Sequence, residues 1–459
     1  MNAATAALPA PSPGAAHASP GSGRATGERA PEGPVDLRLV APGLAAWGAA
    51  ALALGAPGGW TAVGVALCGT AAGLLLLAGR GTARRRAGPR AGRWRGNAVA
   101  GAAVLLGAAA GAASAGLHGA DLKRGPVPGL AEEHARVVAE VTVTADPRPS
   151  LPKASGHRAA PASAVLNVQV TRVTAPDGAV TRVRTPVLVI ARLGEDGQHR
   201  DAWLRLLPST RLRVTGRLAL PQRSGDPFAA VLYADTGPPR VTGPPTALQH
   251  TAGELREGLR AATDGLPPDA RALLPGLVVG DTSRIPHDLR TAFEATDLTH
   301  LLAVSGSNLS IVLLLLIGPA GTALSAERGG LAPRLGIPLR ATALLGGGLV
   351  LAFVVVCRPE PSVLRAAACG SVTLLAIGTG RRRSLLPALA AAVLLLVLYE
   401  PWLARSYGFL LSVLATGALL TVAPRWSAAL QARRVPPRIA EALAAAAAAQ
   451  AVCAPVVAV

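Results

Sequence analysis

Several residue types are scarce in this sequence. Its 459 residues include 4 Phe, 3 Tyr and 6 Trp, so aromatic residues make up only 3%. The four cysteines and eight histidines are scattered, and none has the spacing of a metal-ligand set. The sequence also lacks a phosphate loop of the form GxxxxGK[ST], which excludes a P-loop nucleotide hydrolase. We therefore expect no metal and no cofactor.

Lysine occurs only twice, yet the formal net charge is +19, so arginine carries almost all of the positive charge. A bias toward Arg, Ala and Pro is typical of GC-rich genomes, so the charge alone does not argue for a nucleic-acid partner. Half of the residues are hydrophobic, and the mean hydropathy is +0.39. Long uncharged runs of Ala, Leu, Val and Gly predict a polytopic α-helical membrane protein.

Nine uncharged runs are each about long enough to span a bilayer, which takes ~20 residues. They lie near residues 39–57, 60–79, 97–120, 301–323, 341–357, 361–380, 384–399, 406–423 and 439–459. Arginine-rich loops stay in the cytoplasm, and the loop at 80–96 carries seven arginines and no acidic residue. We therefore expect the N-terminus inside the plasma membrane and residues 121–298 outside it.

These runs predict five parts. Residues 1–35 are rich in Ala, Pro, Gly and Ser and lack the apolar core of a signal peptide, so they are expected to be a disordered tail. Two to three membrane helices follow at 36–120. After them we expect an extracytoplasmic β-rich domain at 121–250, an amphipathic interfacial segment at 251–300 and a membrane core at 301–459.

Alternating apolar and polar residues predict strands in the extracytoplasmic part, at 134–147, 163–178, 185–192 and 210–220. Four or five short strands in this length suit a small barrel, and an OB-type barrel is the expected fold. Residues 121–250 hold 17 Arg and Lys against 11 Asp and Glu, a net charge of +6. Such a basic surface is able to follow a phosphate backbone, although it has few aromatic residues for stacking. The candidate DNA contacts are Arg205, Arg211, Arg213 and Arg217. The alternative is an Arg-rich domain with solvated faces.

The most informative stretch is residues 273–317, where a charged segment runs into an apolar helix. Polar and small residues gather in the first half of that helix: His300, Ser305, Gly306, Ser307, Asn308 and Ser310. Polar groups inside lipid are costly, so such a cluster is typical of a protein-buried or water-filled path. Close helix packing through small residues is the alternative.

Arg365 lies four residues into a later apolar run. A mid-membrane arginine costs ~2.5–3.5 kcal/mol on insertion scales, so it needs a partner or a wet cavity. Its side chain could instead extend to the outer interface.

Three patches, in this order, resemble the ComEC family of DNA-uptake membrane proteins. The first joins Gly280, Asp281 and Ser283 to the run from Leu298 to Gly306. The second contains Arg358, Pro361, Ser362, Val363, Arg365 and Ala366. The third contains Gly408, Phe409, Leu411, Ser412 and Ala415.

This resemblance implies a membrane channel for the uptake of single-stranded DNA during natural transformation. DNA would be held by residues 121–250 and pass a polar path formed by His300, Ser305, Ser307, Asn308 and Arg365. The implied partners are single-stranded DNA, membrane lipid, a cytoplasmic DNA-translocating ATPase and an outside DNA receptor. A homo-oligomer is a further option.

Longer members of the family carry a metallo-β-lactamase-like domain with an HxHxDH-type motif, which this sequence lacks. We therefore expect that the chain has no nuclease activity and is not an enzyme. We also expect that it is either a fragment or part of a pore that another polypeptide completes. Two alternatives differ in class. One is a permease for a small anionic or lipid-linked solute. The other is a hydrolase at Ser305, for which His300 lies about 140° away around an ideal helix.

Overall fold

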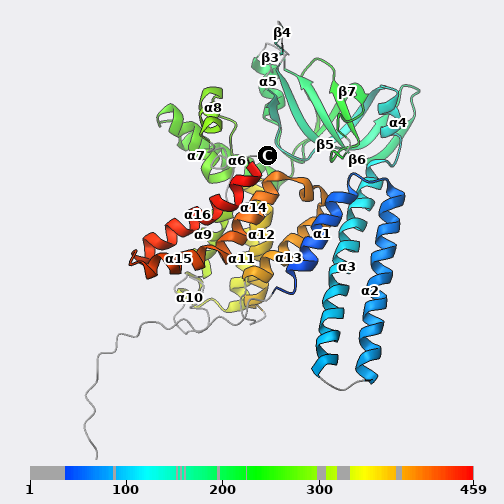
Figure 1. Ribbon diagram of the computed structural model, residues 1–459. Helices are drawn as coiled ribbons and strands as arrows, with labels where there is room; N and C mark the ends of the chain where they lie inside the picture. Colours follow the sequence, from blue (N-terminus) through cyan, green and yellow to red (C-terminus); the bar gives the residue numbers. More distant parts are fainter. Residues whose placement is uncertain are drawn as a thin grey trace, which may run out of the picture. The chain divides into compact units, whose positions relative to one another are not determined.

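A computed structural model of the chain describes residues 37–85, 89–150, 154–155, 158–159, 162–193, 197–223, 225–296, 306–317, 331–378 and 385–457. They belong to one compact unit, Asp36–Val459. Figure 1 shows its helices and strands.

Three helices come first: α1 (Val40–Ala53), α2 (Gly58–Arg85) and α3 (Pro89–Leu122). Helices α1 and α3 approach closely because Gly107 and Gly111 lie in α3, where an added Cβ would meet the α1 backbone at Pro42 and Ala46. Small residues four apart are the usual means by which membrane helices come together. Figure 1 shows α2 alongside α3 over most of their length.

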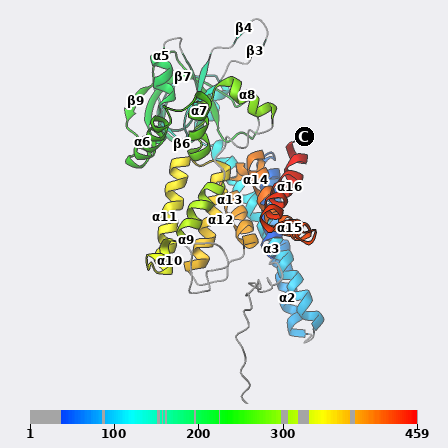
Figure 2. The ribbon, with the colours of Figure 1, turned by 90° about the vertical axis from the view of Figure 1, so that its left-hand side faces the viewer.

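The second half of the chain is helical. Its helices are α9 (Gly306–Ile317), α10 (Leu331–Arg334), α11 (Leu339–Cys357), α12 (Pro361–Gly378), α13 (Leu385–Tyr399), η2 (Pro401–Arg405), α14 (Tyr407–Thr421), α15 (Ala423–Ala432) and α16 (Pro437–Val457). Helix α12 starts with Pro361, whose fixed φ suits a first helical position. Helix α14 starts after Ser406, whose side chain accepts a hydrogen bond from the Phe409 amide at 3.3 Å. Figure 2 shows α9, α11 and α12 side by side, in agreement with their contacts.

Five helical stretches among the described residues are long and apolar enough to cross a membrane. They are Gly58–Arg80, Trp94–Leu122, Leu339–Cys357, Tyr407–Ala432 and Pro437–Val457. Four shorter apolar helices, Val40–Ala53, Asn308–Ile317, Pro361–Leu375 and Leu385–Tyr399, fall on the other predicted runs. The chain is thus a multi-pass membrane protein. Five candidate spans are found, and the count of nine stays a prediction because the shorter helices do not reach the ~20 residues that a span takes.

The first helices pack against the later ones. Trp47 of α1 donates from Nε1 to the carbonyl oxygen of Ala404 at 2.9 Å, and its ring lies 5.1 Å from that of Phe409. Ser114 of α3 donates to the Leu398 carbonyl oxygen at 2.6 Å. Residues more than 280 positions apart therefore share one apolar core.

The strands lie between the two groups of helices in sequence. They are β1 (Arg136–Val143), β2 (Arg148–Ser150), β3 (Ala154–Ser155), β4 (Arg158–Ala159), β5 (Ser163–Thr174), β6 (Val180–Arg192), β7 (Arg211–Ala219), β8 (Ala230–Ala234) and β9 (Arg240–Gly243). Helix α4 (Val127–Glu132) precedes β1, and α5 (Gly197–Leu204) separates β6 from β7. The predicted strands correspond to β1, β5, β6 and β7. Strands β8 and β9 were not predicted.

Five strands close into a barrel-like sheet. Strand β1 pairs with both β5 and β7. The circuit continues from β5 to β6, from β6 to β8 and from β8 to β7, and the pair of β6 and β8 is parallel. Alternate residues point inward, and valine and leucine side chains from β1, β5, β6 and β7 fill the core. The barrel-like region confirms the predicted β-rich domain. Its OB type is not confirmed.

Three helices connect this region to the later ones: α6 (Ala247–Ala262), α7 (Pro268–Val279) and α8 (His287–Ala295). Helix α7 ends at Gly280, which has φ of +73°, a left-handed conformation that favours glycine. Helix α8 follows Pro286 directly.

Candidate functional site

A row of arginines crosses the outer face of the barrel. The strand register places Arg182 of β6 opposite Arg172 of β5, Arg172 opposite Glu140 of β1, Glu140 opposite Arg213 of β7, and Arg213 opposite Arg240 of β9. Directly paired residues point to the same face of a sheet. Neighbouring strands are about 4.8 Å apart, so the row extends roughly 19 Å across five strands.

Glu140 lies in the middle of this arginine row and partly neutralises it. Arg213 donates from Nη2 to its Oε1 at 3.0 Å, and Arg172 Nη1 lies 3.0 Å from its Oε2. The hydrogen bond from Arg213 and the charge of Arg172 hold the pKa of Glu140 below its ordinary value, against the opposing effect of desolvation. The carboxylate is therefore charged at neutral pH, and the row carries a net charge of +3.

The four arginines predicted to contact DNA do not form one group. Arg205 pairs with Asp201 at 3.1 Å, and Arg217 donates to the His134 carbonyl oxygen at 3.1 Å. Arg211 lies over Gly243 of β9. Of the four, the register places only Arg213 in the arginine row, with partners from other strands.

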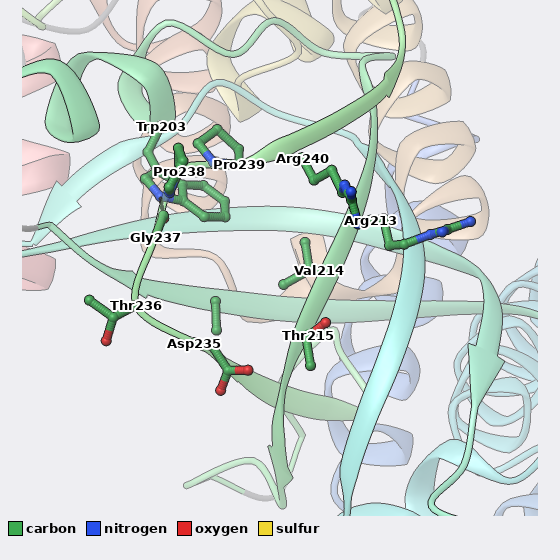
Figure 3. A pocket seen from close by; sticks show the side chains of 11 residues that line it. Trp203, Arg213, Val214, Thr215, Asp235, Thr236, Gly237, Pro238, Pro239 and Arg240 are labelled. Atoms are coloured by element: carbon green, nitrogen blue, oxygen red, sulfur yellow. Dashed lines mark hydrogen bonds between the residues drawn. The ribbon is translucent and has the colours of Figure 1, made fainter. Parts of the chain in front are cut away.

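A cavity of about 280 Å³ lies at the end of the row (Figure 3). It forms where β7 pairs with β9 up to Arg213 and with β8 from Gly216 onward, which leaves Val214 and Thr215 between them. Arg213 and Arg240 line one side of it, and Trp203, Pro238 and Pro239 line another. Trp203 is buried and donates to the Gly237 carbonyl oxygen at 2.9 Å, so its ring is part of the wall.

Arg365 is a half-buried cation in α12. It donates from Nε to the Ser412 hydroxyl of α14 at 2.6 Å. The structure thus joins residues of the second and third motif patches, which are 47 positions apart. In the described ranges no carboxylate lies within 4.0 Å of its guanidinium.

The polar residues predicted to line a path are only partly described. His300 and Ser305 lie outside the described residues, and Gly306 is the first residue of α9. Ser307 follows it in that helix, but its side chain is outside the described set. Asn308 donates from Nδ2 to the Leu277 carbonyl oxygen at 2.9 Å, which ties α9 to α7. In this structure, then, Asn308 makes a contact between helices.

A charged cluster forms where β1, α6, α7 and α11 end near one another. Arg358, directly after α11, donates from Nε to Asp146 Oδ2 at 2.9 Å and also donates to the Gln249 side chain. Arg256 of α6 lies 3.4 Å from the same Asp146 oxygen and 3.7 Å from Asp281 Oδ1. We call Asp146, Arg256, Arg260, Asp281 and Arg358 the charged joint.

Asp281 of the first patch belongs to this charged joint, and Ser283 of the same patch bonds to it. Asp281 is almost fully buried and accepts hydrogen bonds from the Ser283 hydroxyl at 2.6 Å and the Ser283 amide at 3.2 Å. Burial raises the pKa of Asp281, but the Ser283 hydroxyl and the charges of Arg256 and Arg260 outweigh it and lower that pKa overall. Asp281 is thus ionised in the fold.

Three further motif residues lie at the starts of α12 and α14. Pro361 begins α12 between Arg358 and Arg365, and Gly408 and Phe409 lie in the first turn of α14. Phe409 is fully buried against Trp47. Among the described residues, no group of three or more His, Cys, Asp or Glu side chains comes together that could hold a metal ion.

Comparison with known proteins gives two matches and one negative result. Residues 277–459 match the family model described as Competence protein. The chain is also 27% identical over 177 residues to ComE operon protein 3 of Bacillus subtilis (strain 168), which covers 38% of this chain and 21% of that relative. The chain thus matches about a fifth of the relative's length. No solved structure matches. The resemblance to ComEC-type competence proteins is confirmed, and the part of this multi-pass membrane chain that matches the Competence protein model, residues 277–459, is called here the Competence domain.

Proposed function

We propose that this chain forms a membrane path for single-stranded DNA that is taken up during natural transformation. The observation that carries the proposal is Arg365, a half-buried cation inside the Competence domain that is bonded to the neutral Ser412 hydroxyl. A positive charge within a membrane domain is costly unless water or an anion meets it. A phosphodiester backbone supplies such an anion at every nucleotide.

The arginine row supports capture of the strand before it reaches the membrane. It crosses β5 and β6, the second and third strands of the closed circuit. OB-type barrels bind oligonucleotides with that face, and the five-strand circuit supports an OB-type barrel here. Because the row offers guanidinium groups and few aromatic rings, binding should depend on phosphate contacts and on salt rather than on base sequence.

The rest of the proposal follows the prediction of nine spans. The N-terminus and the arginine-rich loops are cytoplasmic, and the barrel faces outward. A cytoplasmic ATPase supplies the driving force and an outside receptor delivers DNA. The chain itself carries no nuclease.

A permease for small anions is the second candidate, because a single half-buried arginine also suits an anion much smaller than a nucleotide. The arginine row disfavours it, since a small anion needs one or two cations and not a band across five strands.

The two candidates are distinguished in a planar bilayer that contains the full chain. An applied voltage pulls on a polyanion directly, so no ATPase is needed. We expect a poly-dT oligonucleotide to cross, with transient blockades of the ionic current. Arg365→Gln should shorten or abolish the blockades, and Arg365→Lys, which keeps the charge, should retain them. The control Arg425→Gln removes an exposed arginine of α15 and should change nothing. Conduction of chloride or phosphate without passage of the oligonucleotide would refute DNA transport and favour the permease.

A further inference from the structure

Arg358 of the charged joint has an unusual backbone. Its φ is +69° and its ψ is +156°. This region of backbone space is essentially restricted to glycine, and a residue with a Cβ stays there only when its surroundings hold it. The conformation therefore requires contacts that fix Arg358.

Those contacts come from distant parts of the chain. Asp146, in the loop between β1 and β2, binds Arg358 across 212 positions, and Gln249 of α6 binds it across 109. The side chain of Arg358 is 10% exposed. Within the described residues, its Nη2 atom and Asp146 Oδ1 are buried without a hydrogen-bond partner, so the pairing is not saturated.

A second set of contacts, made by Arg256, holds the end of α11 next to Arg358. Arg256 donates from Nη1 to the carbonyl oxygens of Val279 and Val356, both at 3.0 Å. It therefore ties the end of α7 to the end of α11, while Asp281 supplies the opposing charge. This arrangement explains why an ionised aspartate is buried at Asp281, a role that the motif alone did not disclose.

The position of Arg358 links this joint to the proposed DNA path. Three residues after it, Pro361 begins α12, and Arg365 lies in the first turns of that helix, about 6 Å further along the axis. Whatever fixes Arg358 therefore fixes the start of the helix that carries Arg365.

We propose that Arg358 is a positioning residue, which holds the start of α12, and with it Arg365, in a fixed position relative to the β1–β2 loop of the barrel. The inference rests on the proposed function, because it assigns to the charged joint the task of keeping the capture surface and the membrane path aligned during transport. The joint itself contacts no DNA.

The test uses the full chain in lipid nanodiscs and in planar bilayers. Arg358→Ala removes the contacts of the side chain but keeps a Cβ in the disfavoured backbone conformation. Arg358→Gly removes the contacts and also the steric cost of that conformation. Asp146→Asn removes one charge with little change in shape and keeps the test usable if the Arg358 variants fail to fold. Arg148→Gln is the matched control, because the exposed Arg148 lies 3.9 Å from Glu360 and links the same two segments outside the joint.

Three quantities are measured: hydrogen exchange of residues 144–150 and 356–361, binding of poly-dT, and its voltage-driven passage. We expect exchange in these segments to rise about tenfold or more in the Arg358 and Asp146 variants, and less in Arg358→Gly than in Arg358→Ala. Binding should stay within about twofold of wild type, while passage falls about tenfold. The control should match wild type in all three.

Unchanged exchange in Arg358→Ala and Asp146→Asn would overturn the proposal, as would normal passage in variants whose exchange has risen. Equal loss of binding and passage in Asp146→Asn would also overturn it, because a positioning role predicts a split between them. If wild-type protein passes no oligonucleotide, the proposed function fails, and faster exchange in the variants would still support the link between Arg358 and Asp146.

Discussion

Replacing Glu140 by Gln should strengthen binding of single-stranded DNA and make it more sensitive to salt. In the wild type, Glu140 engages Arg172 and Arg213, whereas Arg182 and Arg240 of the arginine row pair with no carboxylate in the part of the chain that the structure describes. Glutamine has nearly the same shape but no charge, so all four arginines become available to phosphates.

The change in salt sensitivity follows from the number of arginines available to phosphates, which is two in the wild type and four in the variant. For single strands the slope of log K against log salt is roughly −0.7 per phosphate contact, which gives about −1.4 for two contacts and about −2.8 for four. A fourfold rise in salt should then weaken wild-type binding about 7-fold and binding by the Glu140→Gln variant about 50-fold.

Fluorescence anisotropy of labelled poly-dT, titrated with the full chain in nanodiscs at several salt concentrations, gives both slopes. Arg240→Gln, which removes one of the two wild-type contacts, should flatten the slope to about −0.7, and Arg205→Gln should not change it, because Arg205 pairs with Asp201 outside the row. A slope for Glu140→Gln that is equal to or shallower than that of wild type would refute the phosphate-binding role of the row.

Three further predictions concern stability and transport. Arg365→Met should raise the free energy of unfolding by about 2–3 kcal/mol, because it removes a cation from the membrane domain, while oligonucleotide passage falls; thermal unfolding and bilayer recordings check the two parts. Asp281→Asn should destabilise the protein by about 3 kcal/mol at neutral pH, because it leaves Arg256 and Arg260 without their buried counter-charge. The pKa of Asp281 is lowered in the fold, so its contribution to stability is present above pH ~4 and is lost as the pH falls through the lowered value. The unfolding free energies of Asp281→Asn and wild type should therefore converge at low pH. A difference that stays constant with pH would contradict the buried charge of Asp281. Phe409→Ala should cost about 3–5 kcal/mol by opening a cavity beside Trp47, and a loss under about 1 kcal/mol would show that the site collapses easily.

Local pattern was sufficient for most of the secondary structure. Uncharged runs predicted where the apolar helices lie, since hydropathy is a property of consecutive residues. Alternation predicted β1, β5, β6 and β7 for the same reason. Alternation did not predict β8, whose sequence is AVLYA, or β9, whose sequence is RVTG, because these strands are too short to show a period.

The candidate sites were harder to predict because their residues meet through register and packing. Arg205, Arg211, Arg213 and Arg217 were predicted to contact DNA because they lie close together in the sequence. The arginine row instead runs across strands, and it depends on pairings such as that of Glu140 with Arg172, which no single segment encodes. Asp146 and Arg256 were missed altogether, since Asp146 meets Arg358 across 212 positions and Arg256 meets Val356 across 100. The resemblance did mark Arg365 and Ser412, which the structure brings within hydrogen-bond distance.

The position of the closed strand circuit in the sequence sets the order in which parts of the protein fold during synthesis. All five of its strands lie between Arg136 and Ala234, so the barrel can close while the Competence domain is still being made. Arg358 is added 124 residues later, about 6–25 s at a synthesis rate of ~5–20 residues per second. The contact between Arg358 and Asp146 therefore forms only after all the barrel strands have been made, and it joins a finished barrel to helices that are inserted later.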